Sequence, residues 1–420
     1  MPVNRPTADP PGSWFRLFLP FAVGYYFSYL LRNVNAVIAP VLTRELDLSA
    51  ADLGLLTSAY FVAFGAFQIP LGILLDRYGA RRVEAALLLV AAAGNLVFAL
   101  GDSIGTLAFG RALIGVGVSA CLMAALKSFL LSYPAERQSA LTGAIMTSGG
   151  LGAISASVPL EALLPVLGWR GVFYGLSAVI AAAAVYIYVA VPERPDAVQR
   201  SSFGEQLRGV AHIFVSRAFW RYAPTTMLFS GGFMAIQGLW IVPWFINVDG
   251  LSRDTAAQYL FAVGVMQLAS HFAIATFATR LIRRGIQPAT LIAVSLGVAW
   301  LALLVCVIRL GHPLVGWLVY AFFSGPVTLM YVALGAHFAP QLFGRVSTAI
   351  NLMAFAGAFG LQWGIGLAVD GFTAADWATA PAYRAAIAIV AVLQLLAWVW
   401  FAVEGRQSRR AGAAAAESAP

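Results

Sequence analysis

An arginine inside a long apolar segment is the residue of this sequence with the clearest chemical potential. Arg32 lies in the apolar segment 15–41, about 6 Å from its middle if the segment is a helix. Arginine near the centre of a membrane helix costs about 2.5–3.5 kcal/mol. Polar residues recur around it at helical spacing and form one stripe: Tyr25, Ser28, Tyr29, Arg32 and Asn35. The stripe predicts an anion-binding surface facing a cavity; the alternative is an arginine that reaches the lipid headgroups or forms a structural pair.

A second arginine lies in another apolar segment. Arg111 opens the sequence Arg111-Ala-Leu-Ile-Gly115-Val-Gly117 within 104–132, about 10 Å from the middle of that segment. The two glycines permit close helix packing beside the charge. We expect Arg111 to help Arg32 hold an anion, and the alternative is a structural arginine that bonds the backbone.

Four further residues could serve the same cavity. We expect Gln237 and Asn351 to line it from the second half of the chain. His271 is either a possible proton carrier or a histidine satisfied by its neighbours, and Lys127 is expected to extend to the membrane surface. No Asp or Glu lies in the middle of an apolar segment, which argues against a carboxylate proton relay.

The composition excludes most other classes of protein. The chain has 420 residues, 60% hydrophobic and 10% charged, whereas soluble domains carry about 25% charged residues. The net charge of +8 comes from arginines at segment ends and in connections, so no nucleic acid partner is expected. Cys121 and Cys306 lie inside apolar segments, and no metal spacing, nucleotide loop or catalytic cluster is present. We therefore expect no enzyme, no cofactor and no metal site.

Twelve apolar segments are long enough, at about 20 residues each, to cross a membrane as helices. They are 15–41, 51–75, 83–101, 104–132, 140–165, 170–191, 220–246, 255–279, 288–308, 313–336, 345–369 and 384–403. This pattern predicts an all-α membrane protein with six helices in 1–192, a linker in 193–219 and six helices in 220–420. Within the linker, 204–215 could form an amphipathic helix on the membrane, and the tail from Ala411 is expected to be disordered.

The distribution of basic residues predicts the orientation. Eighteen basic residues lie on the side of the N-terminus and the linker, and five lie on the other side. Because basic residues gather on the cytoplasmic side of a membrane, we expect the linker and both termini in the cytoplasm. The protein is expected in the plasma membrane, as the inner membrane of a bacterium.

A cluster of glycine and charge joins the second and third segments: Gly72, Asp76, Arg77, Gly79, Arg81 and Arg82. Gly79 would allow the chain to reverse, and Asp76 could pair with a helix N-terminus or an arginine. The spacing resembles the Gly-x-x-x-Asp-Arg-x-Gly loop of the major facilitator superfamily, with Ala80 as a departure before the basic pair. We expect the cluster to act in gating.

The two halves of the chain also repeat. Arg137, Ser139, Gly149 and Gly152 match Arg345, Ser347, Gly357 and Gly360 at one offset of 208 residues. Parallel repeats of six spans are typical of this superfamily and place the substrate near the membrane midplane between the halves. The resemblance implies twelve transmembrane helices in two pseudo-symmetric six-helix bundles.

The sequence around Arg32 is similar to that of the organic anion symporters of this superfamily. It carries Tyr-Leu-x-Arg-x-x-Asn followed by Ala39-Pro40. The resemblance implies a monomeric secondary transporter of a small organic anion such as a carboxylate, in contact with membrane lipid and with H⁺ as a possible coupling ion. Leu31 and Val118 stand where that group often has carboxylates, which leaves proton coupling open.

Two alternatives remain at this point. One is export of amphipathic or neutral compounds, although the glycine-proline pattern of that branch is not matched around Pro159. The other is a membrane sensor that keeps the fold and transports nothing, although the short connections offer a partner little surface.

The predicted orientation can be tested with single cysteines. Cysteines placed at Ser201 and Thr373 should react with a membrane-impermeant thiol reagent from opposite sides of the membrane, Ser201 from the cytoplasm, because the basic residues lie on that side. Labelling of both positions from one side would overturn the count of twelve spans.

Overall fold

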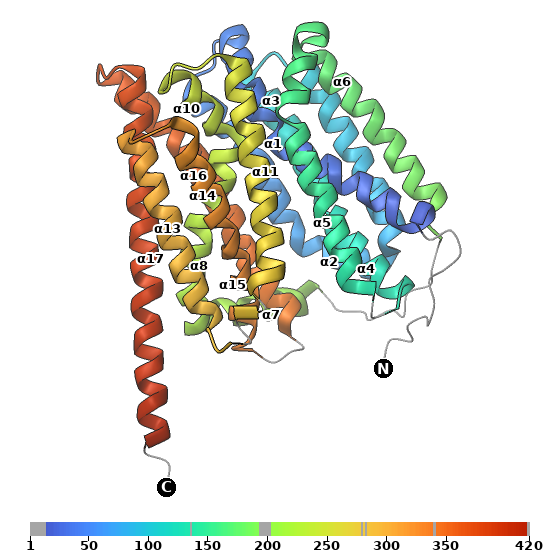
Figure 1. Cartoon of the computed structure of the whole chain (residues 1–420). Helices are drawn as coiled ribbons and strands as arrows, with labels where there is room; N and C mark the ends of the chain where they lie inside the picture. Colours follow the sequence, from blue (N-terminus) through green and yellow to red (C-terminus); the bar gives the residue numbers. More distant parts are fainter. Residues whose placement is uncertain are drawn as a thin grey trace.

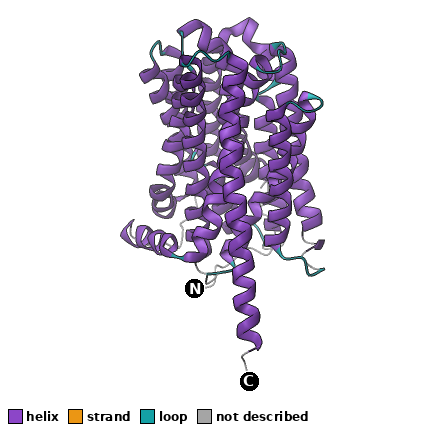
Figure 2. Ribbon diagram, turned by 90° about the vertical axis from the view of Figure 1, so that its left-hand side faces the viewer, coloured by secondary structure: helices purple, strands orange, loops and turns teal. Residues whose placement is uncertain are grey.

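The molecule is a bundle of long helices (Figure 1). The computed structural model describes residues 14–134, 137–192, 203–278, 280–281, 284–338 and 342–417. Within these residues every regular element is helical, with short loops at the two ends of the bundle (Figure 2). The prediction of an all-α protein is confirmed.

Seven helical elements form the first half of the chain. They are η1 (Trp14–Phe18), α1 (Leu19–Leu46), α2 (Ala50–Leu100), α3 (Ile104–Val118), α4 (Cys121–Ser132), α5 (Gln138–Ser155) and α6 (Val158–Ala190). The chain turns inside α2 at Gly79 (φ 78°) and inside α6 at Gly168 (φ 63°). An L side chain would be strained at such a φ, so the prediction that Gly79 reverses the chain is confirmed.

The second half follows the linker helix α7 (Phe203–Val215), which agrees with the helix predicted in 204–215. Its elements are α8 (Arg217–Thr225), η3 (Thr226–Ser230), α9 (Gly231–Ala235), η4 (Ile236–Trp240), α10 (Ile241–Asn247), α11 (Arg253–Ala273), η5 (Ile274–Ala278), α13 (Pro288–Ile308), α14 (Pro313–Ser324), η6 (Gly325–Thr328), α15 (Leu329–Gly335), α16 (Phe343–Ala374) and α17 (Thr379–Glu417). From α8 to α10 the elements form one continuous span with two π-helical turns, η3 and η4.

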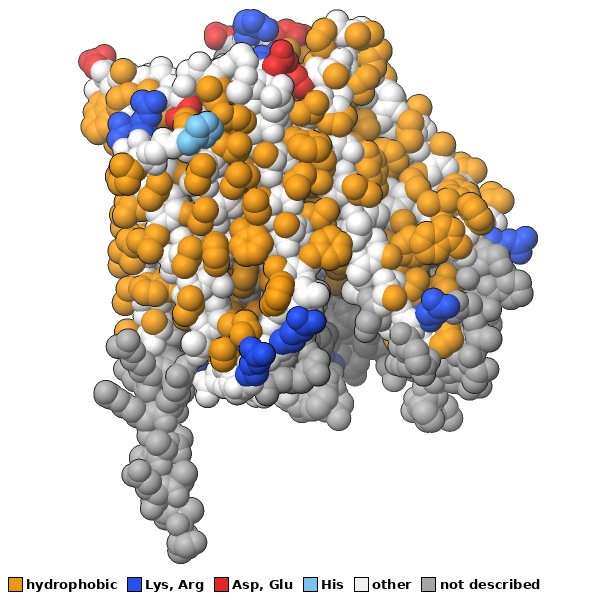
Figure 3. All heavy atoms as spheres, viewed as in Figure 1, with side chains coloured by type: hydrophobic (Ala, Val, Ile, Leu, Met, Phe, Trp, Pro, Cys, Tyr) orange, Lys and Arg blue, Asp and Glu red, His pale blue; other side chains and the backbone are white. Residues whose placement is uncertain are grey.

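Nine helical stretches of the described residues are long and apolar enough to cross a membrane. They are Ala50–Gln68, Pro70–Leu100, Ile104–Ser132, Val158–Ala190, Arg217–Asn247, Pro288–Ile308, Pro313–Gly335, Arg345–Ala374 and Thr379–Val403. Hydrophobic side chains cover the flank of the molecule, and charged side chains gather towards its ends (Figure 3). This distribution is that of an integral membrane protein.

Glycines of the repeat allow equivalent helices of the two halves to pack closely. A Cβ built on Gly152 of α5 would lie 2.0 Å from the carbonyl oxygen of Tyr26 in α1. A Cβ on Gly357 of α16 would lie 1.9 Å from that of Met227 in η3. Only glycine permits such an approach, so the fifth span packs on the first as the eleventh packs on the seventh.

The tail differs from its prediction. The segment from Ala411 was expected to be disordered, whereas α17 continues through Glu417. Alanine has the highest helix propensity of all residues, and an alanine-rich stretch that directly follows a helix extends it.

The two halves are joined by a carboxylate at the end of the molecule opposite α7, called here the far end. Asp370 of α16 accepts hydrogen bonds from the backbone N–H groups of Ala50 (3.0 Å) and Ala51 (2.7 Å) at the start of α2. The next donor, the N–H of Asp52, is satisfied by the Ser49 side chain. Since the first N–H groups of a helix lack partners inside it and carry partial positive charge, Asp370 completes the cap of α2 from the other half.

A second carboxylate makes the equivalent contact. Glu161 of α6 accepts a hydrogen bond from Nη2 of Arg253, the first residue of α11, at 3.0 Å. Glu161 and Asp370 are 209 residues apart, within one residue of the repeat offset. The far end is therefore closed by two pseudo-symmetric contacts, named here the far-end carboxylate contacts.

Neutralising both carboxylates should favour opening of the far end. Hydrogen bonds to charged groups are worth about 1.5–3 kcal/mol, so Glu161→Gln with Asp370→Asn should shift the open-to-closed ratio about tenfold or more. Spin labels on cysteines at Gly105 and Ala375, one in each half, would report the change as longer distances in pulsed electron resonance.

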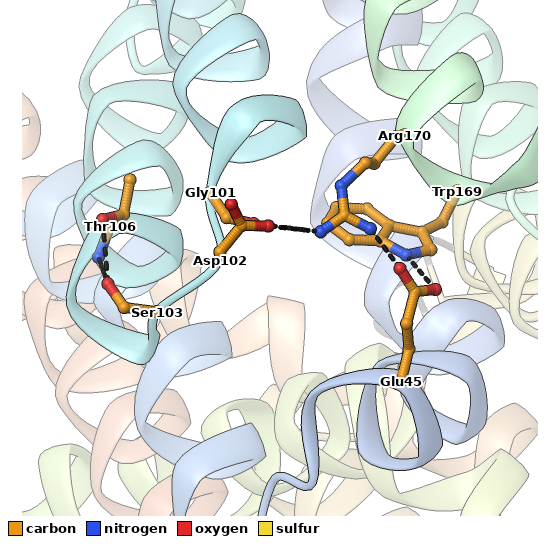
Figure 4. A network of polar contacts seen from close by, with 7 residues as sticks. All are labelled: Glu45, Gly101, Asp102, Ser103, Thr106, Trp169 and Arg170. Carbon is orange, nitrogen blue, oxygen red and sulfur yellow. Dashed lines mark hydrogen bonds and ion pairs between the residues drawn. The ribbon is translucent and has the colours of Figure 1, made fainter.

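The matched control is Asp102→Asn. Asp102 is also at the far end, but it pairs with Arg170 at 2.7 Å inside the first half, in a network with Glu45 and Trp169 (Figure 4). This control should leave the distances unchanged. An unchanged distance distribution in the double variant would contradict the closing role of the two carboxylates.

Candidate functional site

Arg32 lies in the interior among aromatic rings and is only 8% exposed. Its guanidinium carbon is 4.5 Å from the ring centre of Tyr29, 5.3 Å from that of Phe64 in α2 and 5.8 Å from that of Phe355 in α16. Because Phe355 belongs to the second half, the guanidinium lies where the two halves meet. Cation–π contacts of this kind contribute about 0.5–2 kcal/mol each. They therefore compensate only part of the free-energy cost of burying the charge.

The buried Nε of Arg32 has no hydrogen-bond acceptor among the residues that the structure describes, and the Tyr60 phenol lies beside the guanidinium. A guanidinium has five N–H donors. An anion beside Arg32 could therefore receive hydrogen bonds without displacing a protein acceptor. The anion-binding prediction is compatible with this geometry and stays a proposal.

Two tyrosines of α1 stand beside the guanidinium. The rings of Tyr25 and Tyr29 meet edge to face at 5.0 Å, and the Tyr25 hydroxyl points to the sulfur of Met146 at 3.6 Å. A Cβ on Gly149 of α5 would lie 2.6 Å from the Tyr25 ring and 3.0 Å from the Tyr29 ring. The missing side chain at Gly149 thus makes the space in which the tyrosines lie next to Arg32.

Asn35 and Arg111 are engaged inside the first half. Nδ2 of Asn35 donates to Oγ1 of Thr57 at 2.7 Å. Arg111 is fully buried; its Nη1 donates to the carbonyl oxygen of Leu31 at 2.8 Å, and its guanidinium lies 5.1 Å from the Tyr60 ring. Arg111 therefore bonds the backbone next to Arg32, as the structural alternative expected, and direct contact of either residue with substrate stays a prediction.

The second half reaches Arg32 through the π-helical turn η4. Gln237 is buried in this turn, and a Cβ on the adjacent Gly238 would lie 3.6 Å from the Arg32 carbonyl oxygen. π-Helical turns occur frequently at functional sites. Asn351 is held in its own half, where its Oδ1 accepts the hydroxyl hydrogen of Tyr331 at 2.9 Å.

Sequence analysis missed Phe64, whose ring lies near the Arg32 guanidinium, and it named Phe355 only as one of several residues that could line the cavity from the second half. A phenylalanine in an apolar segment carries no signal of its own, because packing phenylalanines have the same pattern. The signal that Phe355 meets Arg32 exists only once the two halves are placed together.

The side chain of His271 forms a hydrogen bond within its own helix. It is exposed, and its Nδ1 donates to the carbonyl oxygen of Gln267, one turn earlier in α11, at 2.9 Å. This is the hydrogen bond that the alternative to a proton carrier expected. A role of His271 in proton transfer stays a prediction.

Lys127 contacts the charged cluster, and its extension to the membrane surface stays a prediction. Its Nζ donates to the carbonyl oxygen of Leu75 at 2.7 Å and to Oδ1 of Asp76 at 3.2 Å. The chain turns at Gly79 shortly after, so a carboxylate and a carbonyl near the helix end come within reach of α4. Arg81 of the same cluster donates to the carbonyl oxygen of Val191 at the end of α6.

Glu84 is an acidic residue that the sequence analysis did not single out. Position 84 lies at the edge of an apolar segment, where burial of a carboxylate was not expected. In the structure Glu84 is 0% exposed, and neither of its carboxyl oxygens has a hydrogen-bond partner among the described residues. The end of a span is buried here because α1 and α4 cover it.

A separate charged pocket lies at the far end of the second half. It is formed by the loops around Asp249 and Arg309 together with His312 and Trp317. Oδ1 of Asp249 is 3.8 Å from Nε of Arg309. Burial raises the pKa of Asp249 above its ordinary value, and the Arg309 charge opposes that rise. The residues of this pocket do not include those around Arg32, so it is not assigned to the site.

A helical membrane protein of two repeated halves, with a buried charge where the halves meet, has the architecture of a secondary transporter. The chain matches the family model of the Major Facilitator Superfamily over residues 21–361, and it belongs to that family. The expectations of a major facilitator transporter, and of a protein that is not an enzyme, are confirmed.

Curated relatives match part of the chain. A probable sulfoacetate transporter of Cupriavidus necator is 26% identical over 37% of this chain and 36% of its own length. The hexuronate transporter of Escherichia coli is 28% identical over 38% of this chain and 37% of its own. The galacturonate transporter of Dickeya chrysanthemi is 27% identical over 42% and 51%. The chain thus aligns with about half or less of each of these relatives.

Solved structures match nearly the whole chain. A bacterial homologue of the human lysosomal transporter Spinster, in an inward-facing and unoccupied conformation, superposes with a TM-score of 0.81, 17% identity and coverage of 94% of this chain and 98% of its own. The nucleoside transporter NupG superposes with a TM-score of 0.73, 15% identity and coverage of 92% and 98%. These likenesses confirm the predicted fold of twelve helices in two six-helix bundles.

The contact of Asp76 with Lys127 leads to a prediction about gating. Asp76→Asn should lower the transport rate about tenfold or more with little loss of folded protein, because a charge-assisted contact worth about 1.5–3 kcal/mol is weakened. Arg77→Ala should also cripple transport. Both are measured as uptake into proteoliposomes at matched protein content.

Lys127→Gln tests whether the Asp76–Lys127 contact matters by itself, apart from the other residues of the glycine and charge cluster. If the pair itself matters, this variant should lower the rate as Asp76→Asn does. Normal transport by both Asp76→Asn and Arg77→Ala would contradict a gating role of the cluster.

Proposed function

We propose that this protein is a secondary active transporter of a small organic anion, probed best with carboxylates. The observation that supports this most is the buried Arg32, whose guanidinium has aromatic neighbours, no carboxylate partner among the described residues and an Nε without an acceptor. Burying an unpaired charge is costly, and a bound anion would supply the missing charge.

The shape of the guanidinium favours a carboxylate or a similar planar or forked anion. Arginine and carboxylate form two parallel N–H···O bonds, which gives geometric specificity as well as energy. The Tyr29 ring next to Arg32 brings a hydroxyl group into the same region. The names of three relatives, which transport sulfoacetate, hexuronate and galacturonate, point to the same class of ligand.

The two halves would alternate access by rocking around Arg32. In this conformation the far-end carboxylate contacts hold the halves together. Substrate would be released at the opposite end, which the positive-inside bias assigns to the cytoplasm. Symport and residence in a bacterial inner membrane belong to the same proposal.

Substitution of Arg32 tests the proposal. Arg32→Lys keeps the charge but loses the planar fork, and should weaken anion affinity about tenfold or more, since a hydrogen bond to a charged group is worth about 1.5–3 kcal/mol. Arg32→Gln should abolish binding with little loss of folded protein. A thermal-shift screen of small carboxylates identifies the anion, and calorimetry then measures its affinity for each variant.

Arg44→Gln is the matched control, because Arg44 lies in the same helix but is exposed. It should leave the affinity unchanged. If Arg32→Gln binds the anion as tightly as the parent protein, Arg32 is structural and the organic-anion proposal is wrong.

A further inference from the structure

The carboxyl group of Glu84 is enclosed by helices of the first half. A Cβ built on Gly24 of α1 would lie 2.5 Å from Oε1 of Glu84, so the carboxyl occupies the space of the missing side chain. The buried thiol of Cys121 in α4 lies beside it. The glutamate therefore fills a pocket that three helices, α1, α2 and α4, build around it.

A carboxyl in this pocket is tolerated only with its proton. An ionised carboxylate removed from water costs far more than a neutral acid unless a positive charge or several donors compensate it. Glu84 has no salt bridge in the described part of the chain, and the Cys121 thiol beside it is only a weak donor. The titratable groups facing it are the Cys121 thiol of α4 and, next to that thiol, the Tyr25 phenol of α1. Both are neutral near pH 7 in their ordinary state. The charged group that also acts at Cys121 is Arg32.

Helix α1 links this carboxyl to Arg32. Gly24 and Arg32 lie eight residues apart on α1, about 12 Å along the helix axis. Tyr25, next to Gly24, packs on Tyr29, whose ring contacts the Arg32 guanidinium. A change at Glu84 that shifts α1 would therefore move the tyrosines and Arg32 together.

We propose that Glu84 is the proton-binding site of this transporter and that its protonation favours anion binding at Arg32. The proton comes from water and adds to the carboxylate, which becomes a neutral acid; loss of the proton restores the negative charge. This inference rests on the proposed transport of an organic anion. Because coupling between two sites is reciprocal, anion binding would raise proton affinity, which makes proton and anion cross the membrane together.

Electrostatics gives the expected size of the coupling. If the separation is taken as the rise of α1 between Gly24 and Arg32, about 12 Å, a unit negative charge on Glu84 would repel the anion by an amount that corresponds to about tenfold in affinity at an effective dielectric constant of about 20. Anion affinity of the parent protein should thus fall about tenfold as Glu84 loses its proton. Glu84→Gln, which mimics the neutral acid, should bind with high affinity and without this dependence on pH.

The first experiment needs no substrate. Infrared spectra of the purified protein in a detergent without ester groups contain a carboxylic acid C=O stretching band only for protonated side chains. The parent protein at neutral pH should show intensity in this band that Glu84→Gln lacks and that the exposed control Asp254→Asn retains. The same carboxylic acid band in the parent and in Glu84→Gln would mean that Glu84 is ionised and would overturn the proposal.

The second experiment measures coupling in proteoliposomes with radiolabelled galacturonate. Glu84→Gln should lose accumulation driven by a pH gradient and keep exchange of internal for external galacturonate, whereas Glu84→Asp should restore part of the accumulation. Accumulation at the parent level by Glu84→Gln would overturn the proposal.

The two proposals fail differently. Absence of galacturonate binding by the parent removes that anion from the organic-anion proposal, while the infrared result alone then decides for or against a protonated Glu84. Loss of both accumulation and exchange in Glu84→Gln, with Glu84→Asp equally inactive, would show a structural role and also overturn the proton site.

Discussion

A positive charge in the interior of a membrane protein has to be compensated within a few ångströms, since neither lipid nor apolar side chains can solvate it. At Arg32 the compensation comes from aromatic faces, and one of them, Phe355, belongs to the other half of the chain. The contact between the two halves at this point therefore depends on whether the guanidinium has an anion bound. A bound anion would compensate the charge in place of the Phe355 ring, so that anion binding and the packing of the two halves become linked.

The repeat determines how the halves can move against each other. Glycines such as Gly152 and Gly357 let helices of one half pack closely, so that each bundle behaves as a unit. Polar links between the units lie at the far end, where Glu161 and Asp370 meet the first turns of α11 and α2. Contacts of two or three hydrogen bonds are weak enough to break within a transport cycle, whereas the network of Arg170, Glu45 and Asp102 holds the first half alone (Figure 4).

The buried ionisable residues of the first half lie on or beside helix α1. Arg111 bonds the backbone carbonyl of Leu31, directly before Arg32, and Glu84 fills the space at Gly24 of the same helix. Helix α1 therefore carries Arg32 and contacts Arg111 and the Glu84 carboxyl, none of which forms a salt bridge to a described residue. Charges in a low dielectric act on each other over about 10 Å, so gain or loss of a proton at Glu84 would change the electrostatic potential along α1.

The sequence by itself determined the class of protein, since hydropathy, arginine placement and the repeat of 208 residues follow from covalent order alone. It also determined the turn at Gly79, because glycine adopts a positive φ without steric strain and charged residues beside it mark the end of a membrane segment. Only the tertiary structure decided that Arg111 and Asn35 are engaged within the first half, that Lys127 meets Asp76, and that Phe355 lies near Arg32. Those contacts join residues far apart in the chain, and helical spacing fixes the face of a side chain but not the helix that it meets. The burial of Glu84 was decided in the same way, because the depth of a residue near the end of a span depends on which helices cover it.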